Sequence, residues 1–82
     1  MNRSQEIFIR KSISEFAAAH QLDLDAHDLQ KALNLFFECG RQWSEHPAKS
    51  VEEIAHSMGL SQSDEHICKV VLDVWTDVYF EK

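Results

Sequence analysis

The sequence contains little glycine, proline or cysteine, and each shortage excludes a class of site or architecture. Only two of the 82 residues are glycine and one is proline, which excludes a glycine-rich phosphate loop and a flexible interdomain linker. The two cysteines, Cys39 and Cys68, form no Cys-x-x-Cys pair, so neither a disulfide framework nor a thiolate zinc site is expected. We therefore expect one domain with free, buried thiols in a reducing compartment, either the cytoplasm, which we favour, or a nucleus.

Long apolar runs are also missing. No stretch approaches the ~18 apolar residues of a membrane helix, and the N-terminus has no apolar run followed by small residues that would mark a signal peptide. We expect no membrane association.

Positive charge is scarce in the second half of the chain. The formal net charge is −6, and residues 50–82 hold two Lys/Arg against seven Asp/Glu, whereas residues 1–49 hold six against seven. An acidic surface repels the phosphates of nucleic acids and favours basic partners. The charge thus either serves ordinary solubility or indicates a basic protein partner rather than a nucleic acid.

Apolar residues at helical spacing predict two helices in the first half of the chain. The first is expected from about Ser4 to His20, with a buried face of Ile9, Ile13, Phe16, Ala17 and His20 that Phe8 widens. The second is expected from Ala26 to about Ser44, capped by Asp25 with Asp28 in its first turn. Its apolar face includes Gly40, which we expect to allow close approach of another helix.

A third, short helix has clear end signals. Ser50 and Glu53 have the spacing of a reciprocal capping box, and Gly59 followed by Leu60 is typical of a helix C-terminus. Its inward face is expected to consist of Val51, Ile54, Ala55 and Met58. Ser61 or Ser63 then caps the last helix, with Asp64 and Glu65 in its first turn.

The last helix, which ends near Phe80, is the most apolar segment of the chain. Its polar residues fall on one narrow stripe, so two sides remain apolar; the stripe consists of Glu65, Lys69, Asp73, Thr76 and Asp77. A helix of this kind must be buried by several neighbours. We predict an all-α, compact four-helix domain with the C-terminal helix central.

The two apolar sides of this helix differ in character. Ile67, Val71, Val74 and Val78 offer compact aliphatic packing, whereas Leu72, Trp75 and Tyr79 carry large side chains that tolerate partial exposure. We expect the first side to pack inside the domain and the second to stay partly available to another protein or a second copy. The predicted protein-binding residues are Leu72, Trp75, Tyr79, Asp73 and Asp77.

Residues 50–71, SVEEIAHSMGLSQSDEHICKVV, resemble the helix-turn-helix of DNA-binding proteins. Ala55, Gly59 and Leu60 stand at the spacing that this family uses in its first helix and turn. The resemblance implies that the start of the last helix enters the major groove. The residues that would then face the bases are Ser61, Gln62 and Ser63.

Two acids depart from the helix-turn-helix pattern. Glu65 stands where the family places an inward apolar residue, and Asp64 and Glu65 would meet DNA phosphates with like charge. DNA-binding transcriptional regulation is therefore the alternative function, after a non-enzymatic protein-binding role as regulator, inhibitor or adaptor.

Histidine and cysteine do not form a catalytic or metal-binding pattern. Of the five histidines, only His66 lies close to a cysteine in sequence, and two positions along a helix turn its side chain about 200° from that of Cys68. No neighbouring base or oxyanion site accompanies either thiol. We expect no metal, no cofactor and no enzymatic activity.

Overall fold

The computed structural model describes residues 3–80, and helices make up most of this part of the chain. The elements are α1 (Arg3–Ala19), α2 (Ala26–Glu45), α3 (Val51–Ser57), the 3-10 turn η1 (Gln62–Asp64) and α4 (Glu65–Tyr79). Within these limits there is no strand, so the predicted all-α class is confirmed.

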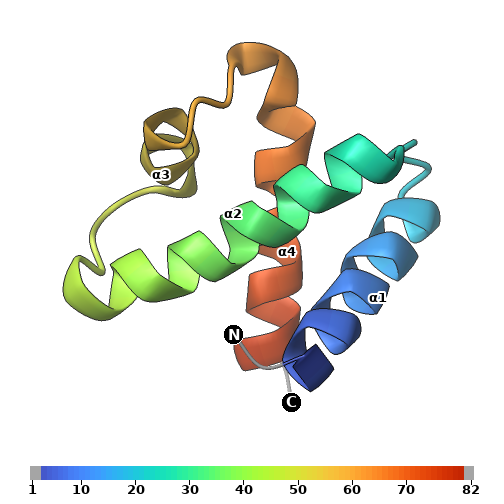
Figure 1. Cartoon of the computed structure of the whole chain (residues 1–82), viewed down its shortest axis with the longest axis horizontal. Coiled ribbons are helices and arrows are strands. Elements are labelled where there is room, and N and C mark those ends of the chain that lie inside the picture. The colour runs from blue at the N-terminus through green and yellow to red at the C-terminus, as the bar shows by residue number, and fades with distance from the viewer. Residues whose placement is uncertain (1–2, 81–82) are drawn as a thin grey trace.

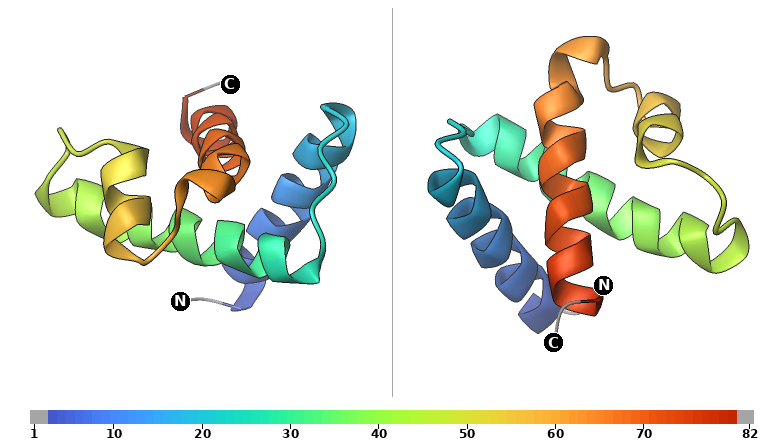
Figure 2. Two further views of the ribbon diagram at one scale, coloured as in Figure 1. Left: turned by 90° about the horizontal axis from the view of Figure 1, so that it is seen from above. Right: turned by 180° about the vertical axis from the view of Figure 1, so that it is seen from behind.

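The helix α4 lies at the centre of the domain, as predicted. It contacts α1, α2, α3 and η1. In Figure 1, α2 crosses in front of α4 while α1 and α3 stand on its two sides. The view from behind shows α4 in front, between α1 and α3, with α2 on its far side (Figure 2). The rear of α4 is therefore the one side that no helix crosses.

The core consists of the aliphatic side of α4 and the faces that the other helices turn toward it. Ile67, Val71 and Val74 are at most 2% exposed, and Val78 packs against the core while half-buried. Their neighbours in the core include Ile13 of α1, Phe36 of α2 and Ile54 of α3. Removing these apolar groups from water is the main force that holds the short helices together.

Two predictions about α2 are confirmed. The carboxylate of Asp25 accepts a hydrogen bond of 2.8 Å from the backbone N–H of Asp28, which caps the helix. A Cβ atom at Gly40 would lie 3.3 Å from the indole carbons of Trp75. The glycine thus allows α4 to bring its tryptophan ring against the backbone of α2.

A residue with positive φ stands two positions after the last residue of α1 and of α3. Gly59 has φ of +87°, and the N–H groups of Gly59 and Leu60 bond back to the carbonyls of His56 and Ala55 at 3.0 and 3.1 Å. This is the expected cap of α3. At the end of α1 the same pair of bonds forms around Gln21, which has φ of +58° without being a glycine.

The start of α4 differs from the prediction. Ser61 begins η1 instead of α4, and its backbone N–H donates to the carboxylate of Asp64 at 3.0 Å. Asp64 is buried and accepts a bond of 3.1 Å from the ammonium of Lys31 on α2. The bond from Ser61, followed by that from Lys31, lowers the pKa of Asp64. Asp64 was expected in the first turn of α4; it is instead the last residue of η1, where it joins two parts of the chain.

Three expectations about buried positions at α1 and α3 are wrong, and the expected capping box of α3 forms only in part. Phe8 and Met58 are exposed, and so is His20, which stacks on the Phe16 ring at 4.2 Å between centroids. At α3, Ser50 accepts the N–H of Glu53 at 3.1 Å, but the carboxylate bonds to the Ser50 hydroxyl, so only one half of the capping box forms.

Candidate protein-binding surface

One stripe of α4 carries the large side chains predicted to meet a partner. Cys68, Leu72, Trp75 and Tyr79 follow one another at steps of four, three and four residues, which places them along one line of the helix. We call these four residues the α4 stripe. Leu72 is 42% exposed and Tyr79 50%, whereas Cys68 is buried and Trp75 half-buried. The stripe thus becomes accessible toward the C-terminal end of α4.

Trp75 belongs to an aromatic cluster that also supports Tyr79. Its ring centroid lies 5.1 Å from that of Phe36, 4.9 Å from that of Trp43 and 4.4 Å from that of Tyr79. The indole N–H of Trp43 donates to the Lys49 carbonyl at 2.7 Å, which fixes the neighbouring ring. The ring of Tyr79 is therefore accessible and rests on packed aromatic side chains, whereas most of the Trp75 side chain is buried inside the domain.

The two predicted acids lie away from the stripe. Asp73 is half-buried and accepts a bond of 3.0 Å from Lys69, one turn earlier on α4. Asp77 is exposed, and no partner for it is found within residues 3–80. At about 100° per residue, Asp77 lies roughly 160° around the helix from Tyr79. The structure therefore groups Leu72, Trp75 and Tyr79 and places Asp73 and Asp77 on the other flank of α4.

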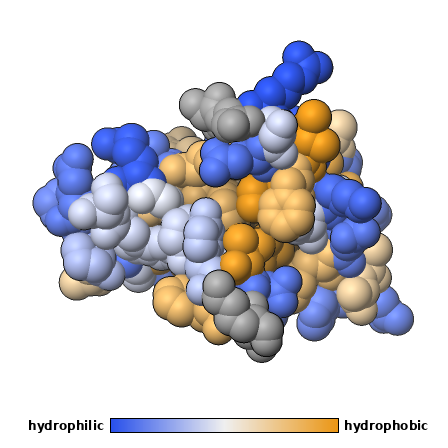
Figure 3. All heavy atoms as spheres, turned by 90° about the horizontal axis from the view of Figure 1, so that it is seen from below, coloured by the Kyte–Doolittle hydropathy of each residue, from blue (hydrophilic) through white to orange (hydrophobic). Residues whose placement is uncertain are grey.

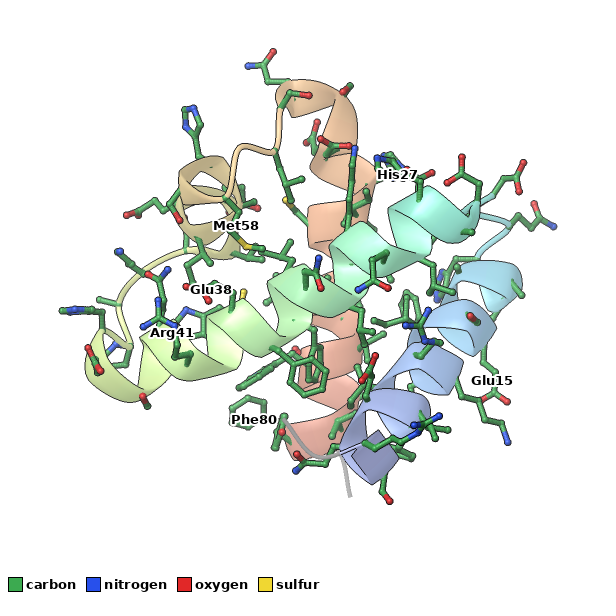
Figure 4. All side chains as sticks on the ribbon, viewed as in Figure 1. Glu15, His27, Glu38, Arg41, Met58 and Phe80 are labelled. Atoms are coloured by element: carbon green, nitrogen blue, oxygen red, sulfur yellow. The ribbon has the colours of Figure 1, made fainter. Side chains whose placement is uncertain are left out.

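Sequence reasoning missed further apolar residues at the end of the molecule where α1 begins and α4 ends. Ile7, Phe8 and Phe80 are 59%, 56% and 71% exposed, more than any residue of the α4 stripe. The start of α1 and the end of α4 lie at the same end of the domain (Figure 1), and apolar side chains gather there in the view from below (Figure 3). Figure 4 shows Phe80 at this end of α4. We call Ile7, Phe8, Tyr79 and Phe80 the terminal apolar patch.

A signal for part of this patch was present in the sequence. Phe8 precedes Ile9 by one residue and so lies about 100° around the helix from Ile9, away from Ile13 and Ala17 of the buried face of α1. Phe80 is the C-cap residue of α4, directly after its last helical residue. Apolar residues near a helix end and off the core face therefore indicate exposed rather than core positions.

The other end of the α4 stripe opens into a pocket between α3 and α4. Its volume is about 540 Å³, and it is lined by Glu52, Ala55, His56, Leu60, Ser61, Gln62, Glu65 and Cys68. Two of the three residues of the DNA-binding alternative, Ser61 and Gln62, lie here, and Ser63 is bound to Ser61 through their hydroxyls at 2.6 Å. Glu52 and Glu65 are exposed at the pocket, and its lining includes no lysine or arginine.

Neither thiol has the character of a nucleophile. Burial raises the pKa of Cys39 to about 12, and burial, followed by the charge of Glu52, raises the pKa of Cys68. Both thiols are therefore protonated at neutral pH. Between residues 3 and 80, no three His, Cys, Asp or Glu side chains come together in a way that could hold a metal ion. No helix in the same range is both long and apolar enough to cross a membrane.

Comparisons of the chain with protein-family models, with curated proteins and with solved structures found no match. What the surface binds has to be inferred from the chemistry of its residues.

Proposed function

We propose that this small acidic protein acts without catalysis, by binding another protein through the accessible part of the α4 stripe and the terminal apolar patch. The observation that carries the proposal is the grouping of exposed large apolar side chains. Four of them, with exposures from 50% to 71%, lie at the end of the molecule where α1 begins and α4 ends, and Leu72 lies further along α4. Single exposed apolar residues are normal on a surface, whereas several large ones at one end of a small domain favour an interaction site there.

The aromatic support beneath Tyr79 adds to the proposal. A ring held by Trp75 and Phe36 loses little conformational freedom when a partner covers it. Tyrosine and tryptophan in such packed positions contribute more to interfaces than most other residues. The expected role is that of a regulator, inhibitor or adaptor whose effect comes from occupying a surface of its partner.

The DNA-binding alternative has weaker physical support. The segment does form two helices joined by a turn, and Ser61, Gln62 and Ser63 are exposed. The exposed carboxylates of Glu52 and Glu65 share this surface, however, and would repel the phosphate backbone. A gel shift on mixed DNA at low salt that disappears at high salt would favour this alternative.

Site-specific photo-crosslinking in cells that express the protein tests the proposed function. A benzoylphenylalanine replaces Leu72 or Tyr79 and, as a control, the exposed Asp23 in the turn between α1 and α2, at the opposite end of α1 from the terminal apolar patch. We expect discrete adducts with another polypeptide from positions 72 and 79 and none from position 23. An adduct with a second copy would assign the surface to a homodimer. Absence of adducts at 72 and 79, or equal adducts at all three positions, would contradict the proposal.

A further inference from the structure

We propose that the pocket between α3 and α4 receives an arginine or lysine side chain of the partner that packs on the α4 stripe. This inference rests on the proposed function, because it extends the same surface toward the N-terminal end of α4. It adds a polar, charge-selective part to a surface that is otherwise apolar. The partner is thereby specified as a segment with both an apolar face and a basic edge.

The pocket and the apolar surface are parts of one continuous track. Cys68 lines the pocket and is also the first residue of the α4 stripe, with Leu72 one turn further along the helix. From Cys68 to Tyr79 the track is about 16 Å long at 1.5 Å per residue. The rear of α4, between α1 and α3, is not crossed by another helix (Figure 2). An extended or helical segment can therefore reach the pocket and the exposed rings at the same time.

The shape and lining of the pocket suit a long side chain with a cationic end. Ala55, Leu60 and Cys68 supply apolar contacts, and Glu52 of α3 and Glu65 of α4 supply carboxylates from two separate helices. Arginine and lysine combine an apolar stem with a charged head in the same way. A guanidinium or ammonium at this place would form charge-assisted hydrogen bonds with the two carboxylates.

No cation of the chain itself balances these carboxylates within the part that the structure describes. Two lysines of the same region are already engaged: Lys69, one turn after Glu65, is bound to Asp73, and Lys31 of α2 is bound to Asp64 of η1. The formal net charge of −6 opposes the approach of a second copy and favours a basic partner. Charge complementarity thus selects a cationic segment of another protein as the occupant.

Two synthetic amphipathic helical peptides provide the test. They share one face of leucine and tryptophan and differ only along one polar edge, which carries arginine in one peptide and its neutral isostere citrulline in the other. Titration calorimetry measures the Kd of each peptide for the wild-type protein, for the Glu52→Gln/Glu65→Gln variant and for the Glu15→Gln control. The control removes a carboxylate of α1, far from the pocket (Figure 4). Circular dichroism confirms that each variant is folded.

We expect the arginine peptide to bind the wild-type protein about tenfold more tightly than the citrulline peptide. This ratio should fall to about one in the Glu52→Gln/Glu65→Gln variant and stay unchanged in Glu15→Gln. A ratio that survives the double substitution would overturn the pocket proposal.

The outcomes separate this inference from the proposed function. If both peptides bind equally and Leu72→Ser weakens both, the protein-binding surface stands and the pocket proposal is wrong. If neither peptide binds, both are contradicted. Sedimentation could also show that the protein self-associates and that Glu52→Gln/Glu65→Gln weakens this association. The pocket would then belong to an interface with a second copy, and the proposal of a cationic segment from another protein would be wrong.

Discussion

Gln21 and Gly59 occupy the same backbone position at the ends of two helices, and only one of them suits it. Both have positive φ, at +58° and +87°, and both close the same pair of hydrogen bonds to the preceding turn. A residue with a Cβ atom is disfavoured in this conformation, whereas glycine adopts it freely. The end of α1 is therefore held at a cost that the end of α3 avoids.

Substitution of these two residues should have opposite effects on stability. Gln21→Gly relieves the strained position and should raise the free energy of unfolding by ~1 kcal/mol. Gly59→Ala should lower it by ~1 kcal/mol, although no atom lies within 4 Å of the added Cβ, because the backbone conformation alone is unfavourable. Urea denaturation measures both. Changes of the same sign in the two variants would mean that φ does not control the stability of these ends.

Asp64 shows what sequence reasoning cannot reach at the scale of a residue. Its neighbours suggested an acid in a first helical turn, and the sequence spacing gave no reason to pair it with Lys31, 33 positions earlier. Local signals such as the Asp25 cap were predicted correctly because donor and acceptor lie within one turn. Contacts between distant residues depend on helix packing, which the local pattern does not contain.

At the scale of elements, α4 was the most predictable helix because its apolar residues repeat over fifteen residues. The side with Ile67, Val71 and Val74 is buried, and Leu72 and Tyr79 on the other side remain accessible, as predicted. Trp75 is the exception, since Gly40 lets its ring pack against α2. A substitution of Trp75 would thus disturb the fold together with the surface, and Leu72 and Tyr79 are better positions for tests of binding.

The two sides of α4 should respond differently to truncation. Val74→Ala removes buried methyl groups from the core and should lower the free energy of unfolding by ~1–3 kcal/mol. Leu72→Ser changes a side chain that is already 42% exposed and should cost less than ~1 kcal/mol. Chemical denaturation of the two variants under the same conditions checks this difference. An equal or larger loss for Leu72→Ser would place Leu72 in the core and remove it from the binding surface.

At the scale of the whole molecule, the start of α1 and the end of α4 lie together and form a surface that neither segment has alone. The sequence predicts four helices and a central α4, but the end at which α1 and α4 come together depends on the packing angles of all helices. Ile7, Phe8 and Phe80 were for this reason absent from the predicted site, although Leu72 and Tyr79 were included. The pocket between α3 and α4 likewise exists only once the turn at Gly59 has folded α3 back toward α4.

The most direct test of the account is the affinity of the partner identified by crosslinking for a variant with an altered surface. The variant is Leu72→Ser/Tyr79→Ser, its control is Glu15→Gln, and the free energy of unfolding of each is measured in parallel. We expect the double substitution to weaken binding by about 30-fold or more, as is typical of interface anchors. The free energy of unfolding should fall by no more than ~1 kcal/mol, and the control should bind as the wild-type protein does. Unchanged affinity in the double variant would contradict the assignment of this surface to partner binding. Weaker binding that is fully explained by a smaller fraction of folded protein would contradict it as well.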